Sequence, residues 1–82
     1  NGFDWNETDG LFDKLLEEAD ELKQAVANKD NDEIEKEAGD LLFQAVNICR
    51  YLGMDAETTL NKAVFYEIIV FYDSPFSDMP VL

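Results

Sequence analysis

The chain has 82 residues and a formal net charge of −13, from 19 acidic and 6 basic side chains. Such an excess of acid argues against partners that are nucleic acids or anionic membrane surfaces, because both require clustered Lys and Arg. The sequence has no His and a single Cys49, which excludes His-based zinc sites and an internal disulfide and fits a reducing cytoplasm. We expect one small domain over residues 1–82, with a core so limited that it needs a partner subunit.

Residues 1–8 form a polar lead-in with two aromatic side chains, Phe3 and Trp5. These rings either pack on the helical core as a lid or stack on a nucleobase, and large aromatic side chains do both. A first helix is predicted to begin within residues 6–9, where several capping side chains are available. Its apolar residues recur at steps of three and four, which is the helical period; they are Leu11, Phe12, Leu15, Leu16, Ala19, Leu22 and Val26.

Residues 28–31 have the composition of a turn, and a second helix is predicted from about Asp32 to Leu52. Helices joined by so short a turn pack antiparallel. Gly39 costs about 1 kcal/mol relative to Ala inside a helix, which suggests close approach of a backbone or a ligand at this position. The stripe expected to be buried consists of Ile34, Ala38, Leu41, Leu42, Ala45, Ile48, Cys49 and Leu52.

A third helix is predicted over residues 56–72, after a stop at Gly53 and a cap at Asp55. Its apolar run is too short to span a membrane and is interrupted by Glu67 and Asp73. Many of its residues are β-prone, but several keep the helical period; these are Leu60, Val64 and Ile68. The predicted class is therefore all-α: an antiparallel helical hairpin and a third helix, which form a bundle by oligomerisation.

Two acidic signatures have carboxylates three residues apart, Glu18 with Glu21 and Glu37 with Asp40. This spacing places each pair on one face of its helix, on a flank of the apolar stripe. Four carboxylates brought together by packed helices repel one another unless a cation lies between them. Oxygen ligands of this kind suit Mg²⁺ or Mn²⁺, and Mg²⁺ usually arrives with a phosphate-bearing substrate.

The alternative is that these acids form only a solvated helix face, which is the usual role of a charge run. Four lysines could balance them through pairs worth about 0.2–0.5 kcal/mol each; they are Lys14, Lys23, Lys29 and Lys36. The residues alone leave both interpretations open.

The order of short motifs resembles that of the MazG-type nucleoside triphosphate pyrophosphohydrolases, most of all the C-terminal half of two-domain bacterial proteins. The motifs are Gly-Phe-Asp-Trp at 2–5, Glu-Glu-x-x-Glu at 17–21, Glu-x-Gly-Asp-Leu-Leu-Phe at 37–43 and Val-Asn-x-x-Arg-Tyr-Leu-Gly at 46–53, within a match over about residues 2–63. The resemblance implies an all-α dimer or dimer of dimers that hydrolyses a (d)NTP to the monophosphate and pyrophosphate with Mg²⁺. It also implies that the metal ligands and catalytic acids are Glu18, Glu21, Glu37 and Asp40, one of which would orient or deprotonate the attacking water.

The segment 64–82 departs from the family. The family usually continues past residue 63 with an Asn, a Lys and an Arg that hold phosphates, whereas this chain has Val64, Tyr66 and Val70 and keeps only Lys62 nearby. The candidate substrate-binding residues are Lys62, Asn47, Trp5 and Phe3. The expected function is removal of unwanted (d)NTPs from nucleotide pools. The alternatives are a catalytically impaired homologue acting as a nucleotide-binding or interaction module, and a plain acidic helical oligomer.

Overall fold

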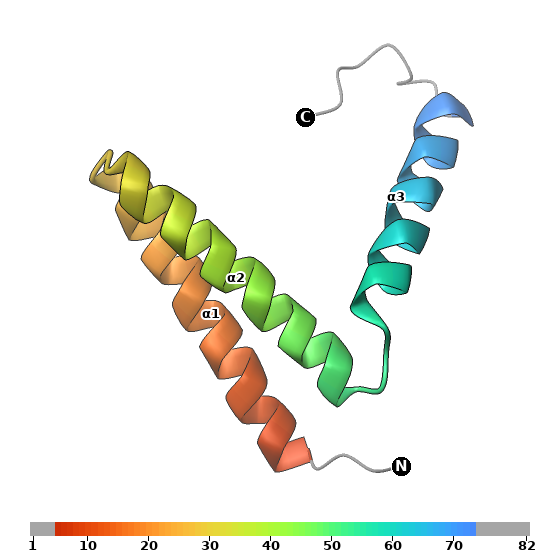
Figure 1. Cartoon of the computed structure of the whole chain (residues 1–82), viewed down its shortest axis with the longest axis horizontal. Coiled ribbons are helices and arrows are strands. Elements are labelled where there is room, and N and C mark those ends of the chain that lie inside the picture. The colour runs from red at the N-terminus through yellow and green to blue at the C-terminus, as the bar shows by residue number, and fades with distance from the viewer. Residues whose placement is uncertain (1–4, 74–82) are drawn as a thin grey trace.

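Three helices make up the chain in the computed structural model, which describes residues 5–73 and the side chains from 6 to 70. They are α1 (Trp5–Ala27), α2 (Asn31–Tyr51) and α3 (Ala56–Asp73), and the described residues include no strand. The helices α1 and α2 pack side by side as an antiparallel hairpin, whereas α3 contacts only α2 and diverges from it (Figure 1). The predicted all-α class, with an antiparallel hairpin and a third helix, is thus confirmed, and every described helix end is within one residue of its prediction. Phe3 and the predicted irregular tail lie outside the described residues.

The turn between α1 and α2 is fixed by its own backbone. After α1, the N–H of Lys29 donates to the carbonyl of Val26 at 3.1 Å, and the N–H of Asp30 donates to that of Ala25 at 3.3 Å. These two bonds form a Schellman motif, which requires a left-handed residue, here Lys29 with φ 57°. Asp30 then caps α2, because its carboxylate accepts from the N–H of Glu33 at 3.2 Å.

The end of α2 uses the same motif with a glycine. Gly53 has φ 83°, and the N–H of Met54 donates to the carbonyl of Cys49 at 2.8 Å. Asp55 begins the next helix: one of its carboxylate oxygens accepts from the hydroxyl of Thr58 at 2.5 Å and from the backbone N–H of Thr58 at 3.3 Å. The predicted stop and cap are both confirmed.

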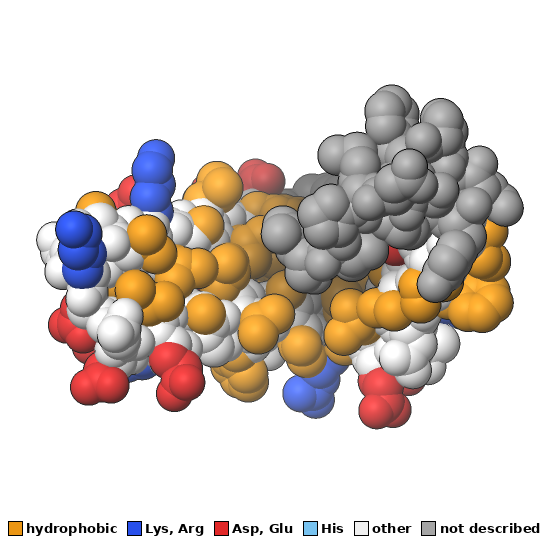
Figure 2. Space-filling model, turned by 90° about the horizontal axis from the view of Figure 1, so that it is seen from above, with side chains coloured by type: hydrophobic (Ala, Val, Ile, Leu, Met, Phe, Trp, Pro, Cys, Tyr) orange, Lys and Arg blue, Asp and Glu red, His pale blue; other side chains and the backbone are white. Residues whose placement is uncertain are grey.

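The hairpin buries little apolar surface. Among the described residues, only Ala25 and Ile48 are buried hydrophobic side chains. The prediction that the whole stripe of the second helix is buried is therefore wrong: Ile48 is buried, but Leu42 is 69% exposed, Ala45 is exposed, and the other members are half-buried. Two packed helices bury only the side chains along their line of contact, so the rest of each apolar stripe faces outward. Figure 2 shows hydrophobic side chains gathered along the face of the molecule that it presents.

The described side chains of α3 are largely apolar and exposed on several sides. A helix that is hydrophobic all round normally lies in a core, and α3 has no other described helix over it except at the end of α2. No described helix is both long enough and apolar enough to traverse a lipid bilayer. The exposed apolar residues of α3 are Leu60, Val64, Phe65, Tyr66, Ile68, Ile69 and Val70.

Candidate metal centre

The middle of the α1–α2 contact is polar. Glu18 from α1 and Glu37 from α2 are each 5% exposed, and Gln44 is buried beside them. The sequence placed the acids on the flank of each stripe, and for Glu18 and Glu37 this flank is buried in the contact between the helices. The apolar stripes turn toward the outside of the hairpin, so the carboxylates move into the contact between the helices.

The four predicted carboxylates come together. Oxygens of Glu18, Glu37 and Asp40 lie within 4.8 Å of one another, and oxygens of Glu17, Glu18 and Glu21 form a second such group. Glu18 belongs to both groups, so the cluster joins α1 to α2. One oxygen each of Glu18 and Glu37, Oε2, is fully buried and has no hydrogen-bond partner. A buried carboxylate oxygen without a partner is costly, which suits a site that a cation completes.

Two lysines reach the cluster from its open side. The Nζ of Lys14 lies 3.2 Å from Oε1 of Glu18, and the Nζ of Lys36 lies 3.1 Å from Oε1 of Glu37 and 3.5 Å from Asp40. Hydrogen bonds to Glu18 and to Glu37, respectively, raise the pKa values of Lys14 and Lys36. Both lysines are largely exposed, so they can leave the acids without crossing a packed core.

The pKa values of Glu21 and Glu37 are shifted in opposite directions across the two helices. A hydrogen bond with Glu37, followed by partial burial, raises the pKa of Glu21. Hydrogen bonds from Lys36 and then from Glu21 lower the pKa of Glu37. Of the two carboxylates, Glu21 is thus the one that is harder to ionise, and a metal ion must compete with protons for it as a ligand.

A hollow of about 370 Å³ adjoins the cluster, and the predicted substrate-binding residue Asn47 lies in its wall. The Nδ2 of Asn47 donates to Oε1 of Gln44 at 3.4 Å, and the Nε2 of Gln44 donates to the backbone carbonyl of Leu11 at 3.0 Å. The lining residues are Lys14, Glu18, Asp40, Phe43, Gln44 and Asn47.

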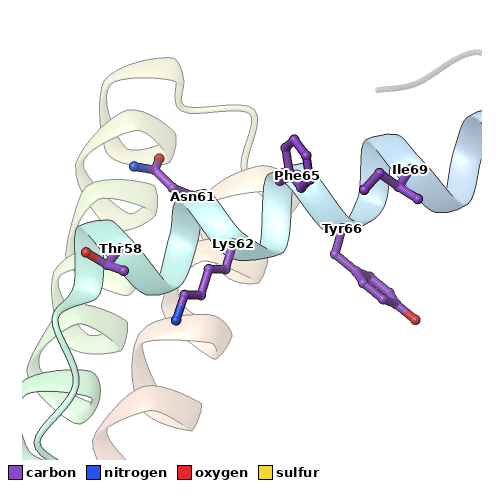
Figure 3. A pocket seen from close by; sticks show the side chains of 6 residues that line it. All are labelled: Thr58, Asn61, Lys62, Phe65, Tyr66 and Ile69. Carbon is purple, nitrogen blue, oxygen red and sulfur yellow. The ribbon is translucent and has the colours of Figure 1, made fainter.

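Lys62 does not reach the cluster within this chain. It lies on α3 in the wall of a separate hollow of about 490 Å³, whose lining residues all come from that helix (Figure 3). The helix α3 diverges from the hairpin, so the predicted cation and the predicted acids are apart. Phe3 and the side chain of Trp5 lie outside the described residues.

Two of the four lysines expected to balance the acids do so: Lys14 pairs with Glu18 and Lys36 with Asp40, each at a spacing of four residues. Phe43 is the residue of this site that the sequence does not identify, because nothing in the helical period distinguishes an aromatic ring beside a site from one in a core.

Comparison with known proteins places the chain in a family. The family described as the MazG nucleotide pyrophosphohydrolase domain matches residues 7–69. The chain is 50% identical over 62 residues to the nucleoside triphosphate pyrophosphohydrolase/pyrophosphatase MazG of Thermotoga maritima, with 76% of this chain and 23% of that protein covered. It is 47% identical over 66 residues to the nucleoside triphosphate pyrophosphohydrolase of Escherichia coli K12, with 76% and 24% covered.

The chain thus spans about a quarter of the length of these curated relatives. No solved structure gives a significant match. The family match continues six residues beyond residue 63, where the resemblance read from the motifs ended, and so it includes most of α3. Because this match covers more than half of the 82 residues, the chain belongs to the MazG nucleotide pyrophosphohydrolase domain family.

Proposed function

We propose that this chain is a Mg²⁺-dependent nucleoside triphosphate pyrophosphohydrolase domain that acts in the cytoplasm on unwanted (d)NTPs. One observation carries the proposal: two helices each place a buried carboxylate oxygen without a partner in one cluster, Oε2 of Glu18 and Oε2 of Glu37. A solvated helix face has no reason to bury acids in this way. Family membership and the names of the relatives support the same activity.

The donor set fits a hard divalent cation. All four proposed ligands are carboxylates, and the cluster contains neither sulfur nor imidazole, which suits Mg²⁺ and, as a substitute, Mn²⁺. In this proposal Glu18, Glu37 and Asp40 are ligands of one metal ion, and Glu21 joins them as a ligand in its ionised form. When bound, the metal supplies positive charge to the phosphates and lowers the pKa of a water molecule.

The chain's own groups then orient the reaction. The oxygen of the attacking water forms a bond to the α-phosphorus and the water gives up a proton to a carboxylate of the cluster, while the anhydride bond between the α- and β-phosphates breaks and pyrophosphate leaves with the bonding electrons. Lys14 and Lys36, which pair with Glu18 and Glu37 in the structure, would be available to phosphate oxygens once these acids held a metal ion. Placement and positive charge are the main requirements of such a transfer.

The direct test is release of pyrophosphate from a panel of nucleoside triphosphates with and without Mg²⁺. We expect metal-dependent release by the wild type and a loss of at least about 100-fold in Glu37→Gln, because the substituted amide is a weaker ligand than a carboxylate. Glu35→Gln is the matched control, since Glu35 is an exposed α2 residue outside the cluster. Full activity of a chain carrying both Glu37→Ala and Asp40→Ala would exclude the mechanism.

A second candidate is a nucleotide-binding or interaction module with impaired catalysis. The separation of Lys62 from the acids favours it, together with the apolar Val64 and Val70 on the same helix. One well-placed electrostatic contact supplies about 3 kcal/mol to a transition state, so missing phosphate-binding groups would leave metal binding but slow the reaction. Introducing Asn, Lys and Arg at positions 64, 66 and 70 should then raise the rate at least tenfold, and an unchanged rate would count against this candidate.

We also propose that the domain works as a homo-oligomer, a dimer or a dimer of dimers. The exposed apolar surface of α2 and α3 supports this state, because it leaves a single chain without a core. Nucleic acids and membranes are not proposed as partners, since the net charge is −13.

A further inference from the structure

The hollow beside the cluster contains groups that metal binding does not require. Glu18 and Asp40 in its wall belong to the candidate metal centre, so the hollow opens directly onto that centre. The rest of its wall includes the aromatic ring of Phe43 and the carboxamides of Gln44 and Asn47. An aromatic face and precisely oriented amides are the means by which proteins bind bases and sugars.

We propose that this hollow binds the nucleoside part of the substrate. The base stacks on the ring of Phe43, and the carboxamide oxygen of Asn47 accepts a hydrogen bond from the base or the sugar. This inference rests on the proposed function, because it places the nucleoside relative to the cluster that would hold the triphosphate.

The position of Phe43 supports stacking. Its side chain is 64% exposed although it projects from α2 only three residues after Asp40. Residues three apart lie on one side of a helix, so the ring and the carboxylate flank the same opening. On the other side of the ring, Asn47 follows at four residues and completes the wall.

Gln44 acts through Asn47 as a positioning residue. It is 6% exposed, and it is held by its hydrogen bond to the carbonyl of Leu11 on the opposite helix. Its own oxygen accepts from the Nδ2 of Asn47. This turns the nitrogen of Asn47 toward Gln44 and presents its oxygen to a donor in the hollow.

The other hollows described are less suited to a nucleoside. The one on the far side of the cluster, of about 210 Å³, offers four carboxylates and neither an aromatic ring nor a lysine; its lining residues are Glu21, Gln24, Ala25, Asn28, Asp30, Glu33 and Glu37. The hollow on α3 has the rings of Phe65 and Tyr66 but lies apart from the acids.

Two probes separate nucleoside contacts from phosphate contacts. We would measure by calorimetry, with Mn²⁺ present, the dissociation constants of α,β-methylene deoxynucleoside triphosphates, which resist hydrolysis, and of inorganic tripolyphosphate, which has no nucleoside. Phe43→Ala should raise the dissociation constants of the nucleotide analogues by roughly 5- to 100-fold, the range expected for the loss of one stacked base. Its affinity for tripolyphosphate should stay within about twofold of the wild type.

Leu16→Ala is the matched control, because Leu16 is a similarly exposed apolar residue of the hairpin that neither lines the hollow nor lies on α2. It should change the affinity for neither probe. Sedimentation of every variant identifies changes of assembly. If Phe43→Ala weakens the binding of both probes equally, or dissociates the protein, Phe43 belongs to a subunit contact and the proposal is overturned.

A double-mutant cycle tests the role of Gln44. Asn47→Ala should raise the dissociation constants of the nucleotide analogues by about 3- to 10-fold. Gln44→Ala should raise them by a similar factor, because it removes the hydrogen bond that orients Asn47. Gln44→Ala should therefore add nothing in a chain that already carries Asn47→Ala, whereas a merely structural role would give additive losses. If the wild type binds neither probe with Mn²⁺, the proposed function fails; if it binds both and the variants behave as the wild type, only the nucleoside site fails.

Discussion

At the scale of single residues, Glu21 is the carboxylate whose protonation should link stability to metal binding. Its pKa is raised mainly by the hydrogen bond with Glu37, so its ionised form is disfavoured in the folded chain without metal. A raised pKa in the folded state contributes stability below the unfolded pKa, and this contribution is lost as the pH rises through the folded pKa. We therefore expect the metal-free protein to keep this contribution below a pH of about 4.3, the unperturbed pKa of Glu, and to lose it as the pH rises through the higher folded pKa of Glu21.

Glu21→Gln should reverse this effect. The amide can donate to Glu37 at every pH, so the metal-free variant should melt a few degrees above the wild type at pH 7. The same change removes a proposed ligand, so the rise in melting temperature on adding Mn²⁺ should shrink. Thermal unfolding at pH 5 and pH 7, with and without Mn²⁺, measures both effects, and Glu35→Gln should show neither. A metal-free variant that melts below the wild type at pH 7 would contradict the assignment of the proton to Glu21.

The site was predictable from the sequence in part. The spacing of Glu18, Glu21, Glu37 and Asp40 identifies four acids on two helices, because the helical period alone determines which residues share a face. It does not determine the rotation of each helix against its neighbour. That rotation depends on which part of a wide apolar stripe packs against the other helix and which part stays outside. The burial of Glu18 and Glu37 follows from this rotation and not from the spacing of the residues.

At the scale of elements, the two helix ends with the same motif allow a paired test. Lys29 and Gly53 both have positive φ, a conformation that costs a residue with a side chain up to about 1 kcal/mol. Lys29→Gly should raise the free energy of unfolding by up to that amount, and Gly53→Ala should lower it by about the same amount, as measured in urea. If both substitutions change the free energy of unfolding in the same direction, factors other than the left-handed conformation determine the stability at these two positions. The positions of the ends were predictable because Asn, Asp and Gly mark them.

The first turn of α3 gives a second prediction at this scale. Hydrogen bonds from the hydroxyl and then the backbone N–H of Thr58 lower the pKa of Asp55. A lowered pKa contributes stability above the unfolded value of about 3.9, and this stability is lost as the pH falls through the folded pKa. Helical content measured by circular dichroism should therefore fall in acid more steeply in the wild type than in Asp55→Asn, which keeps a capping side chain without the charge. Parallel curves for the two proteins would contradict a role for this ionisation.

At the scale of the whole molecule, the chain is too open for its mass. Its accessible surface of 6859 Å² exceeds by roughly a third the area of about 5,000 Å² expected for a compact monomer of 9.4 kDa. Its radius of gyration is 15.9 Å, whereas a compact domain of 82 residues has about 12 Å. The sequence could not show this, because the helical period counts apolar residues without indicating which chain covers them. We infer that the missing core is supplied by another copy.

The outer face of α2 is the place to test that inference. Leu42 lies two residues from Asp40, which on a helix turns it roughly 160° away from the acids. A copy packed there keeps the two clusters, and most of the repulsion between chains of charge −13, away from the contact. Leu42→Glu places a charge in that contact, so we expect sedimentation to show a monomer with a melting temperature that no longer rises with protein concentration. Gln24→Glu adds the same charge on α1 away from this face and should leave assembly intact. A wild type that is monomeric at about 100 μM would refute the shared core, because a dimer with a micromolar dissociation constant is largely formed at that concentration. Such a result would also require the exposed apolar surface of α3 to be covered in another way.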